Sequence, residues 1–120
     1  MRIFRNTWFT KFAGKESISD KELQEAVNLL ETGQADANLG GNVYKVRVAR
    51  SGEGKSGGYR VIVFFKKGNK TFYVYGFAKS ERANISEKEK RYFKDKAKDY
   101  FSLTDEQLKK MIDYDELVEI

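Results

Sequence analysis

The residues of this sequence that could do chemistry are basic. Ten lysines and arginines, but only two acidic residues, lie between Asn38 and Arg82, whereas the whole chain of 120 residues has a net charge of +5. The ten are Lys45, Arg47, Arg50, Lys55, Arg60, Lys66, Lys67, Lys70, Lys79 and Arg82. So dense a group of positive charges predicts a surface that handles a polyanion.

The chain contains no histidine and no cysteine. This excludes a Ser-His-Asp triad, a cysteine nucleophile, disulfide bonds and thiolate metal sites, and we expect neither a metal nor another cofactor. The sequence also shows no signal peptide after Met1 and no apolar run of membrane-spanning length. We therefore expect a cytoplasmic protein that does not bind membranes.

A glycine-rich segment from Ser51 to Gly58 separates two strand-like runs. The residues from Ala49 to Ser56 fit the nucleotide-binding pattern G-x-x-x-x-G-K-S/T, except that alanine replaces the first glycine. That motif requires a helix after the loop, because the N–H groups at the helix N-terminus hold the phosphate. Here the loop leads into Tyr59 to Phe65, which is typical of a strand. We therefore interpret the segment as a basic hairpin loop rather than a nucleotide site.

Two arginines stand out among the basic residues. Arg60 lies within an apolar strand-like run, and Arg47 has a similar position in the preceding run. A charge inside such a strand is costly unless it has a partner or a function, so both are candidates for a functional site. Lys66, Lys67 and Lys70 instead flank a turn, where lysines often only keep a sheet edge soluble.

The elements that must carry these residues form an α+β pattern. Three runs, Val43 to Arg50, Tyr59 to Phe65 and Thr71 to Ala78, predict strands that short links join into an antiparallel sheet. Residues 1–6 could form a short strand or an extended arm. The aromatic residues of the third strand could stack on nucleobases, but we favour positions in the core; they are Phe72, Tyr73, Tyr75 and Phe77.

Helices are predicted before and after this sheet. Trp8, Phe9 and Phe12 have helical spacing, and capping boxes at 19–22, 86–89 and 104–107 mark three further helix starts. We expect the second helix to stop near Gly33 and the acidic end of the chain to be a solvated terminus. The sequence thus predicts one α+β domain, 1–120: N-terminal helices packed on a small antiparallel sheet, with residues 86–120 as a helical C-terminal extension.

Three segments carry motifs that are informative in combination. Leu39 to Arg50 contains an R-V-A strand, Gly54 to Phe65 a G-K-x-G-G-Y-R transition, and Phe72 to Arg82 a strand ending in K-x-E. Together they resemble the RelE/HigB-like toxins of bacterial type II toxin–antitoxin systems, in the RelE/ParE superfamily. The resemblance implies an α+β fold and a ribosome-dependent endoribonuclease that cleaves mRNA in the decoding site. It also implies attack by the RNA 2′-OH, leaving a cyclic phosphate and a free 5′-OH, with Lys and Arg in place of histidine.

The resemblance assigns roles to the basic residues. Arg60 of the Y-R pair matches the family's catalytic arginine, which stabilises the charge that develops on the phosphorane. Lys55 of the loop, Arg47 of the preceding strand and Lys79 after the last strand match further basic residues of the catalytic set. The remaining expected RNA contacts are Lys45, Arg50 and Arg82, of which Arg82 is also an alternative to Lys79.

The general base stays open. Related toxins often have an arginine where Lys79 stands and a tyrosine near the C-terminus. Tyr92, Tyr100 and Tyr114 are all candidate counterparts of that tyrosine. A lysine that served as the base would need a lowered pKa, which neighbouring cations can provide.

The resemblance implies a cognate antitoxin as partner, of helix-turn-helix type, together with the ribosome and mRNA. Operator DNA would be bound only through the antitoxin. Two alternatives are a non-catalytic toxin of the same superfamily that inhibits DNA gyrase, and a plain RNA-binding module. Gyrase-binding relatives lack the basic catalytic set, so Arg47, Lys55, Arg60 and Lys79 favour the nuclease.

Overall fold

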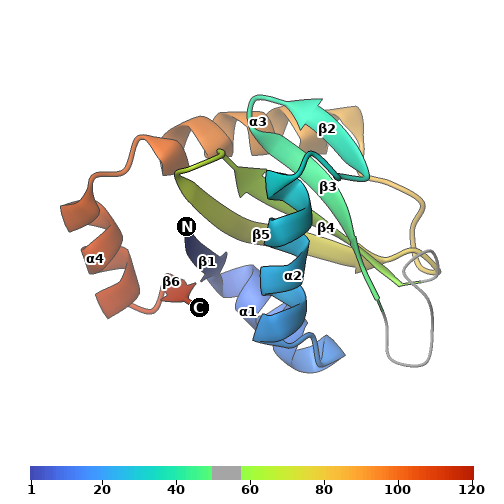
Figure 1. Cartoon of the computed structure of the whole chain (residues 1–120), viewed down its shortest axis with the longest axis horizontal. Coiled ribbons are helices and arrows are strands. Elements are labelled where there is room, and N and C mark those ends of the chain that lie inside the picture. The colour runs from blue at the N-terminus through green and yellow to red at the C-terminus, as the bar shows by residue number, and fades with distance from the viewer. Residues whose placement is uncertain (50–57) are drawn as a thin grey trace.

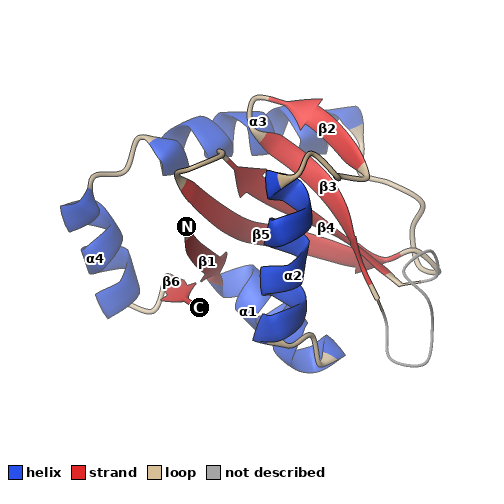
Figure 2. Cartoon of the chain, viewed as in Figure 1, coloured by secondary structure: helices blue, strands red, loops and turns tan. Residues whose placement is uncertain are grey.

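The computed structural model describes residues 1–49 and 58–120. In this part of the chain six strands form one sheet, in the order β2-β3-β4-β5-β1-β6, and four helices pack around it (Figures 1 and 2). The predicted α+β class is confirmed. The elements are β1 (Arg2–Asn6), α1 (Thr7–Glu16), α2 (Asp20–Glu31), β2 (Ala37–Gly40), β3 (Val43–Val48), β4 (Tyr59–Phe65), β5 (Lys70–Ala78), α3 (Glu87–Phe101), α4 (Asp105–Asp113) and β6 (Leu117–Glu119).

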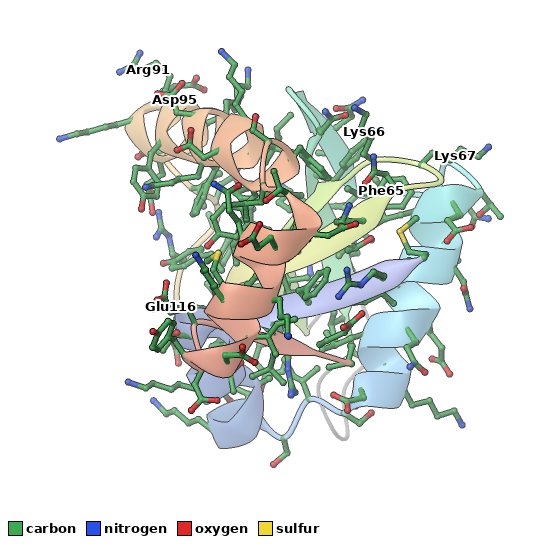
Figure 3. All side chains as sticks on the ribbon, turned by 90° about the vertical axis from the view of Figure 1, so that its left-hand side faces the viewer. Phe65, Lys66, Lys67, Arg91, Asp95 and Glu116 are labelled. Carbon is green, nitrogen blue, oxygen red and sulfur yellow. The ribbon has the colours of Figure 1, made fainter. Side chains whose placement is uncertain are left out.

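Strands β3, β4 and β5 form the antiparallel centre of the sheet, as predicted. The middle strand, β4, is buried along its whole length. Gly68 in the turn between β4 and β5 has a φ of 71°, a left-handed conformation that glycine adopts without strain. Lys66 and Lys67 are exposed at this turn, next to Phe65 (Figure 3).

The two ends of the chain extend this antiparallel centre. β1 runs parallel to β5, and β6 pairs with β1 in the antiparallel direction. The prediction of a solvated acidic terminus is wrong, because Leu117 is 1% exposed and Glu119 accepts a hydrogen bond from Arg2 at 2.8 Å. Residues 86–120 therefore contain an edge strand as well as α3 and α4.

Strand β2 at the opposite edge was not predicted. Its sequence, Ala-Asn-Leu-Gly, has little strand propensity. It is held by antiparallel pairing with β3, in which Ala37 lies opposite Lys45, and the register shifts between Asn38 and Gly40. This edge fixes the position of the residue that precedes it, Asp36.

The helices begin where the sequence predicts, and the second helix ends close to Gly33 as expected. Ser19, Ser86 and Thr104 each accept a hydrogen bond from the third helical residue, and all three capping boxes are complete. Helix α2 ends at Glu31, and Gly33 follows it with a φ of 79°. None of the helices in the described part of the chain has the length and apolar character needed to cross a bilayer.

The helices cover both faces of the sheet (Figure 1). Helices α1 and α2 pack on one face, which includes Val61 and Tyr73, while α3 and α4 pack on the other, which includes Ile62 and Phe72. Phe72 and Tyr73 are completely buried, so the core interpretation of these two aromatic residues is confirmed. Burial raises the pKa of the Tyr73 phenol, whose hydroxyl donates to the Leu23 carbonyl at 2.6 Å.

Candidate functional site

Neighbouring strands bring three of the basic residues together. Arg47 of β3 and Arg60 of β4 lie directly opposite each other in the antiparallel register. Lys45 is two residues before Arg47 on β3, so alternation places it on the same face. This is also the face on which Ile62 packs against the α3 side of the core.

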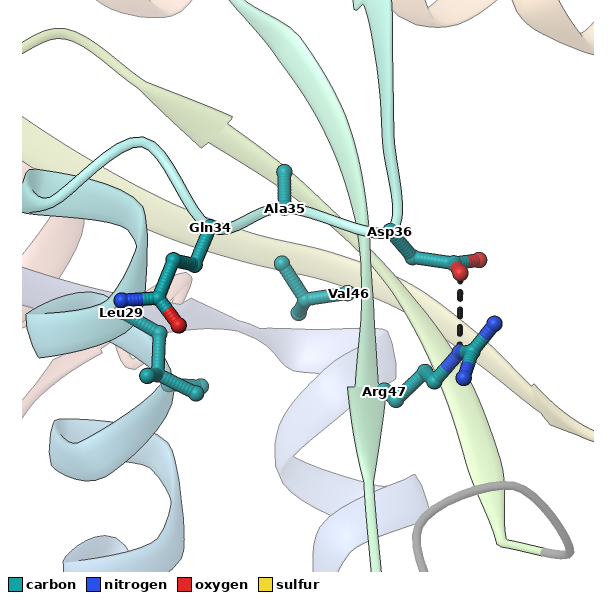
Figure 4. Close-up of a pocket in the computed structure, with 7 residues that line it drawn as sticks. Leu29, Gln34, Ala35, Asp36, Val46 and Arg47 are labelled. Carbon is teal, nitrogen blue, oxygen red and sulfur yellow. Dashed lines mark hydrogen bonds and ion pairs between the residues drawn. The ribbon is translucent and has the colours of Figure 1, made fainter.

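A carboxylate that the sequence argument missed lies among these three cations. Asp36 Oδ1 accepts a hydrogen bond from Arg47 Nε at 2.8 Å (Figure 4). Its other oxygen, Oδ2, is 3.6 Å from Arg60 Nε and 3.7 Å from Lys45 Nζ. We call these four residues the Asp36 cluster. Asp36 lies just outside the basic stretch, and only the unpredicted pairing of β2 with β3 would have placed it there.

The members of the Asp36 cluster differ in exposure. The Arg60 side chain is 5% exposed, and those of Asp36 and Lys45 are 14% exposed. Arg47 is 48% exposed and forms the solvent side of the cluster. Three cations contact this one carboxylate, so positive charges outnumber negative charges among these four residues. Such an excess favours binding of an anionic group.

A pocket of about 420 Å³ adjoins the Asp36 cluster between α2 and β3 (Figure 4). Arg47 and Asp36 form one wall, so the charged groups border a concave surface rather than a flat one. The remaining lining is mostly apolar and comprises Ala26, Leu29, Gln34, Ala35 and Val46.

Arg82 lies in a second charged group, which we call the Arg82 network: Arg82, Glu89, Tyr75 and Asn84. The guanidinium donates to both carboxylate oxygens of Glu89, at 2.6 and 3.1 Å, to the Tyr75 hydroxyl at 3.0 Å and to the Asn84 carbonyl at 3.0 Å. It also lies 5.4 Å from the centre of the Phe77 ring. These contacts tie the segment after β5 to the first turn of α3.

The ion pair in the Arg82 network shifts the pKa values of both Arg82 and Glu89. Hydrogen bonds from Arg82 and from the Ser86 backbone lower the pKa of Glu89 to about 2. The same bond to Glu89 raises the pKa of Arg82 above its ordinary value. The two networks meet at Asn84, whose side-chain oxygen accepts a hydrogen bond from Lys45 at 3.4 Å.

The other expected site residues are less closely grouped. Lys79 is exposed directly after β5, and its backbone N–H donates to Gly58 at 3.3 Å, near the start of β4. Arg50 and Lys55 lie outside the described residues. The structure thus joins Lys45, Arg47 and Arg60, places Lys79 at the same end of the sheet, and holds Arg82 in a separate network.

The three tyrosines considered as the missing counterpart lie on different elements. Tyr92 and Tyr100 of α3 line a pocket of about 430 Å³ together with Trp8 and Tyr75. Burial raises the pKa of Tyr100. Tyr114 caps the end of α4 and is 76% exposed. Across residues 1–49 and 58–120 there is no group of three or more side chains suited to hold a metal ion.

Comparison with known proteins agrees with the motifs and the fold. The family model described as the RelE toxin of the RelE/RelB toxin–antitoxin system matches residues 1–120. No curated protein matches the chain. The resemblance seen in the sequence is confirmed by the family match. The chain belongs to the RelE toxin family and is a toxin of a toxin–antitoxin system, with an antitoxin as its partner.

Proposed function

We propose that this toxin is an endoribonuclease that cleaves mRNA on the ribosome and thereby inhibits translation and growth. The observation that carries the proposal is the Asp36 cluster, in which Arg47 and Arg60 lie opposite each other on adjacent strands. Membership of the RelE family supports it, since toxins of this family are generally endoribonucleases.

The main requirement of the proposed reaction is stabilisation of the negative charge that develops on the phosphorane, which lysine and arginine can provide without a metal or a histidine. The RNA 2′-oxygen attacks the neighbouring phosphorus and its proton passes to a base. The bond to the 5′-oxygen breaks, and that oxygen gains a proton, which leaves a 2′,3′-cyclic phosphate and a free 5′-OH. Negative charge grows on the phosphorane oxygens during the attack, and fixed cations stabilise it more than they stabilise the ground state.

Each basic residue has a role in this proposal. Arg60, which is nearly buried and fixed on β4, stabilises the phosphorane, and Arg47 contacts the phosphate from the solvent side. Lys45 adds positive charge from β3. Lys79 lies directly after β5. We assign proton transfer to Lys79, to Lys55 or to a tyrosine.

The expected RNA contacts are not equivalent. Arg50 remains a prediction outside the described residues. The guanidinium of Arg82 is engaged by Glu89, Tyr75 and Asn84, which favours a role in holding the segment after β5. We therefore assign Arg82 to support of the site and retain Lys45 as a contact.

The test is cleavage of mRNA on purified ribosomes whose decoding site holds a defined codon, with the ends mapped by primer extension. The wild-type toxin should give one dominant cut with a cyclic phosphate on the upstream fragment, and Arg60→Gln should remove it. Arg5→Gln is the matched control, because Arg5 is also a strand arginine paired with an aspartate, Asp20, at 3.1 Å.

Three outcomes would contradict the proposal. Cleavage that does not depend on Arg60 would exclude the proposed mechanism. Growth arrest with intact mRNA and damaged DNA would instead identify a toxin that inhibits gyrase. Salt-dependent RNA binding without any cleavage would identify an RNA-binding module.

We also propose how the toxin is controlled. A helix-turn-helix antitoxin would bind the toxin in the cytoplasm, and only this complex would bind operator DNA and repress the operon. Co-expression with the neighbouring gene, followed by operator binding assays of toxin, antitoxin and complex, tests this. Operator binding by the toxin alone would contradict it.

A further inference from the structure

The geometry of the Asp36 cluster leaves three cations closer together than their mutual repulsion favours. Arg47 and Arg60 are directly opposite in register, and like charges in such positions destabilise a strand pair. Arg60 cannot turn away into solvent, since its side chain is only 5% exposed. A counter-charge that touches all three cations offsets this repulsion.

Asp36 is built to be that counter-charge. Its backbone N–H donates to the Lys45 carbonyl at 3.0 Å, and the next residue, Ala37, pairs with Lys45 in the β2–β3 ladder. The carboxylate is therefore anchored to the strand that carries two of the three cations. Its two oxygens have different partners: Oδ1 binds Arg47, while Oδ2 faces Arg60 and Lys45.

We infer that Asp36 is a positioning residue, which fixes Arg47, Arg60 and Lys45 in the arrangement that stabilises the phosphorane. This inference rests on the proposed function of the site. Asp36 itself does not touch the reacting atoms. Its loss would let the cations move apart and weaken transition-state stabilisation, while the removal of a negative charge would leave RNA binding as strong or make it stronger.

The opposite role for Asp36 would have the opposite signature. If the Asp36 carboxylate only occupied the place of the RNA phosphate, RNA would have to displace it. Removal of the carboxylate would then speed cleavage. The sign of the change in kcat therefore separates positioning from competition.

The kinetic experiment compares wild type, Asp36→Asn and Asp36→Glu on programmed ribosomes. Asp36→Asn should lower kcat by roughly 10- to 100-fold with KM unchanged or lower, as expected for an interaction used only in the transition state. Asp36→Glu, which keeps the charge, should lose less. An unchanged or raised kcat for Asp36→Asn would overturn the inference.

The matched control is Asp20→Asn. Asp20 also pairs with a strand arginine, Arg5, but on the side of the sheet covered by α1 and α2, and the substitution removes the same charge. It should leave kcat within about two-fold. An equal fall in kcat for both variants would show a general effect of charge or stability and would count against positioning.

A second readout does not depend on catalysis. The Nε–Hε signals of Arg47 and Arg60 in ¹⁵N NMR spectra should shift and exchange faster with water in Asp36→Asn, but not in Asp20→Asn. If Asp36→Asn does not fold, Asp36→Glu, which keeps the charge but moves the carboxylate by one methylene, should shift the same signals to a smaller extent. Unchanged arginine signals would overturn the role of Asp36, whereas a wild-type protein with ordered arginines and no cleavage would overturn the proposed function instead.

Discussion

The Asp36 cluster and the Arg82 network lie on the same face of the sheet and meet at Asn84, yet they use charge differently. In the Arg82 network one arginine meets one carboxylate through two short bonds, so the charges balance. In the Asp36 cluster one carboxylate serves three cations, and two of its three contacts are longer than 3.5 Å.

Under the proposed function, this difference separates charges that hold the fold together from charges that act on RNA. A balanced pair with its donors satisfied is a device that holds two segments together, and it has little positive potential to offer a ligand. Where cations outnumber anions, part of the positive potential remains to attract an anionic ligand. Basic residues of one stretch of the sequence can therefore belong to opposite classes.

Exchange of the key arginine in each network tests this comparison most strongly. Arg60→Gln should lower kcat/KM for mRNA cleavage on the order of 10²- to 10³-fold, as loss of a charge-stabilising group at a transition state commonly does. Arg82→Gln should change kcat/KM by only a few-fold when the rate is expressed per folded molecule. Quantitative primer extension measures both, and equal losses would erase the distinction.

The free energy of unfolding should depend more on the Arg82 network than on the simpler ion pair between Arg2 and Glu119. Arg82→Gln should lower the free energy of unfolding by about 1–2 kcal/mol, because several charge-assisted hydrogen bonds of a partly exposed group are lost. Arg2→Gln, which removes the more exposed pair with Glu119, should cost only about 0.5 kcal/mol. Urea unfolding gives both values, and a larger loss for Arg2→Gln would contradict the structural role of Arg82.

Arg47 should contribute a phosphate contact of moderate size. Arg47→Gln should weaken binding of an RNA with a 2′-deoxy nucleotide at the cut site by about 1 kcal/mol and reduce the slope of log K against log salt by about one. Lys67→Gln at the exposed turn is the control. If a salt titration gave both variants the same reduced slope, Arg47 would contribute no more to phosphate binding than the lysine at the exposed turn.

The smallest effect concerns acid stability. The folded-state pKa of Glu89 is about 2, below the ordinary 4.5, because the carboxylate binds Arg82 and the Ser86 N–H. A lowered pKa stabilises the fold above the unfolded-state value, so this contribution should disappear as the pH falls from about 4.5 to about 2. For so exposed a pair it should be worth about 1 kcal/mol or less.

The control for this prediction is Glu89→Gln, which has no charge to titrate. Its unfolding free energy should depend less on pH than that of wild type over this interval. Identical pH profiles for the two proteins would show that Glu89 carries no special stabilisation. The Asp36 cluster should be unaffected in either protein, which arginine side-chain NMR at neutral pH can check.

Much of the fold could be predicted because its signals are local. Capping boxes at Ser19, Ser86 and Thr104 depend only on residues three apart, and the apolar run of β4 is a continuous signal. The edge strands depend on long-range pairing instead. Residues 37–40 and 117–119 become strands because β3 and β1 offer them hydrogen bonds.

The same limit applies to the candidate site. Arg47 and Arg60 could be predicted because a charge in an apolar strand is visible in the sequence. Asp36 could not, since its relation to them requires the β2–β3 register. The sequence also could not distinguish Arg82 from the other basic residues. Its partner, Glu89, is explained in the sequence by the capping box alone, and the structure shows that Glu89 binds Arg82 as well.

The pairing of β1 with β6 has a consequence for the order of folding. Arg2 and Glu119 are 117 positions apart, so their contact closes the longest loop of the fold, whereas the Asp36 cluster is complete within the run from Asp36 to Arg60. Loop closure becomes more costly with length, and non-local pairings form slowly. We expect the central hairpins to gather the cations early, and the two ends of the chain, which lie side by side in Figure 1, to join last.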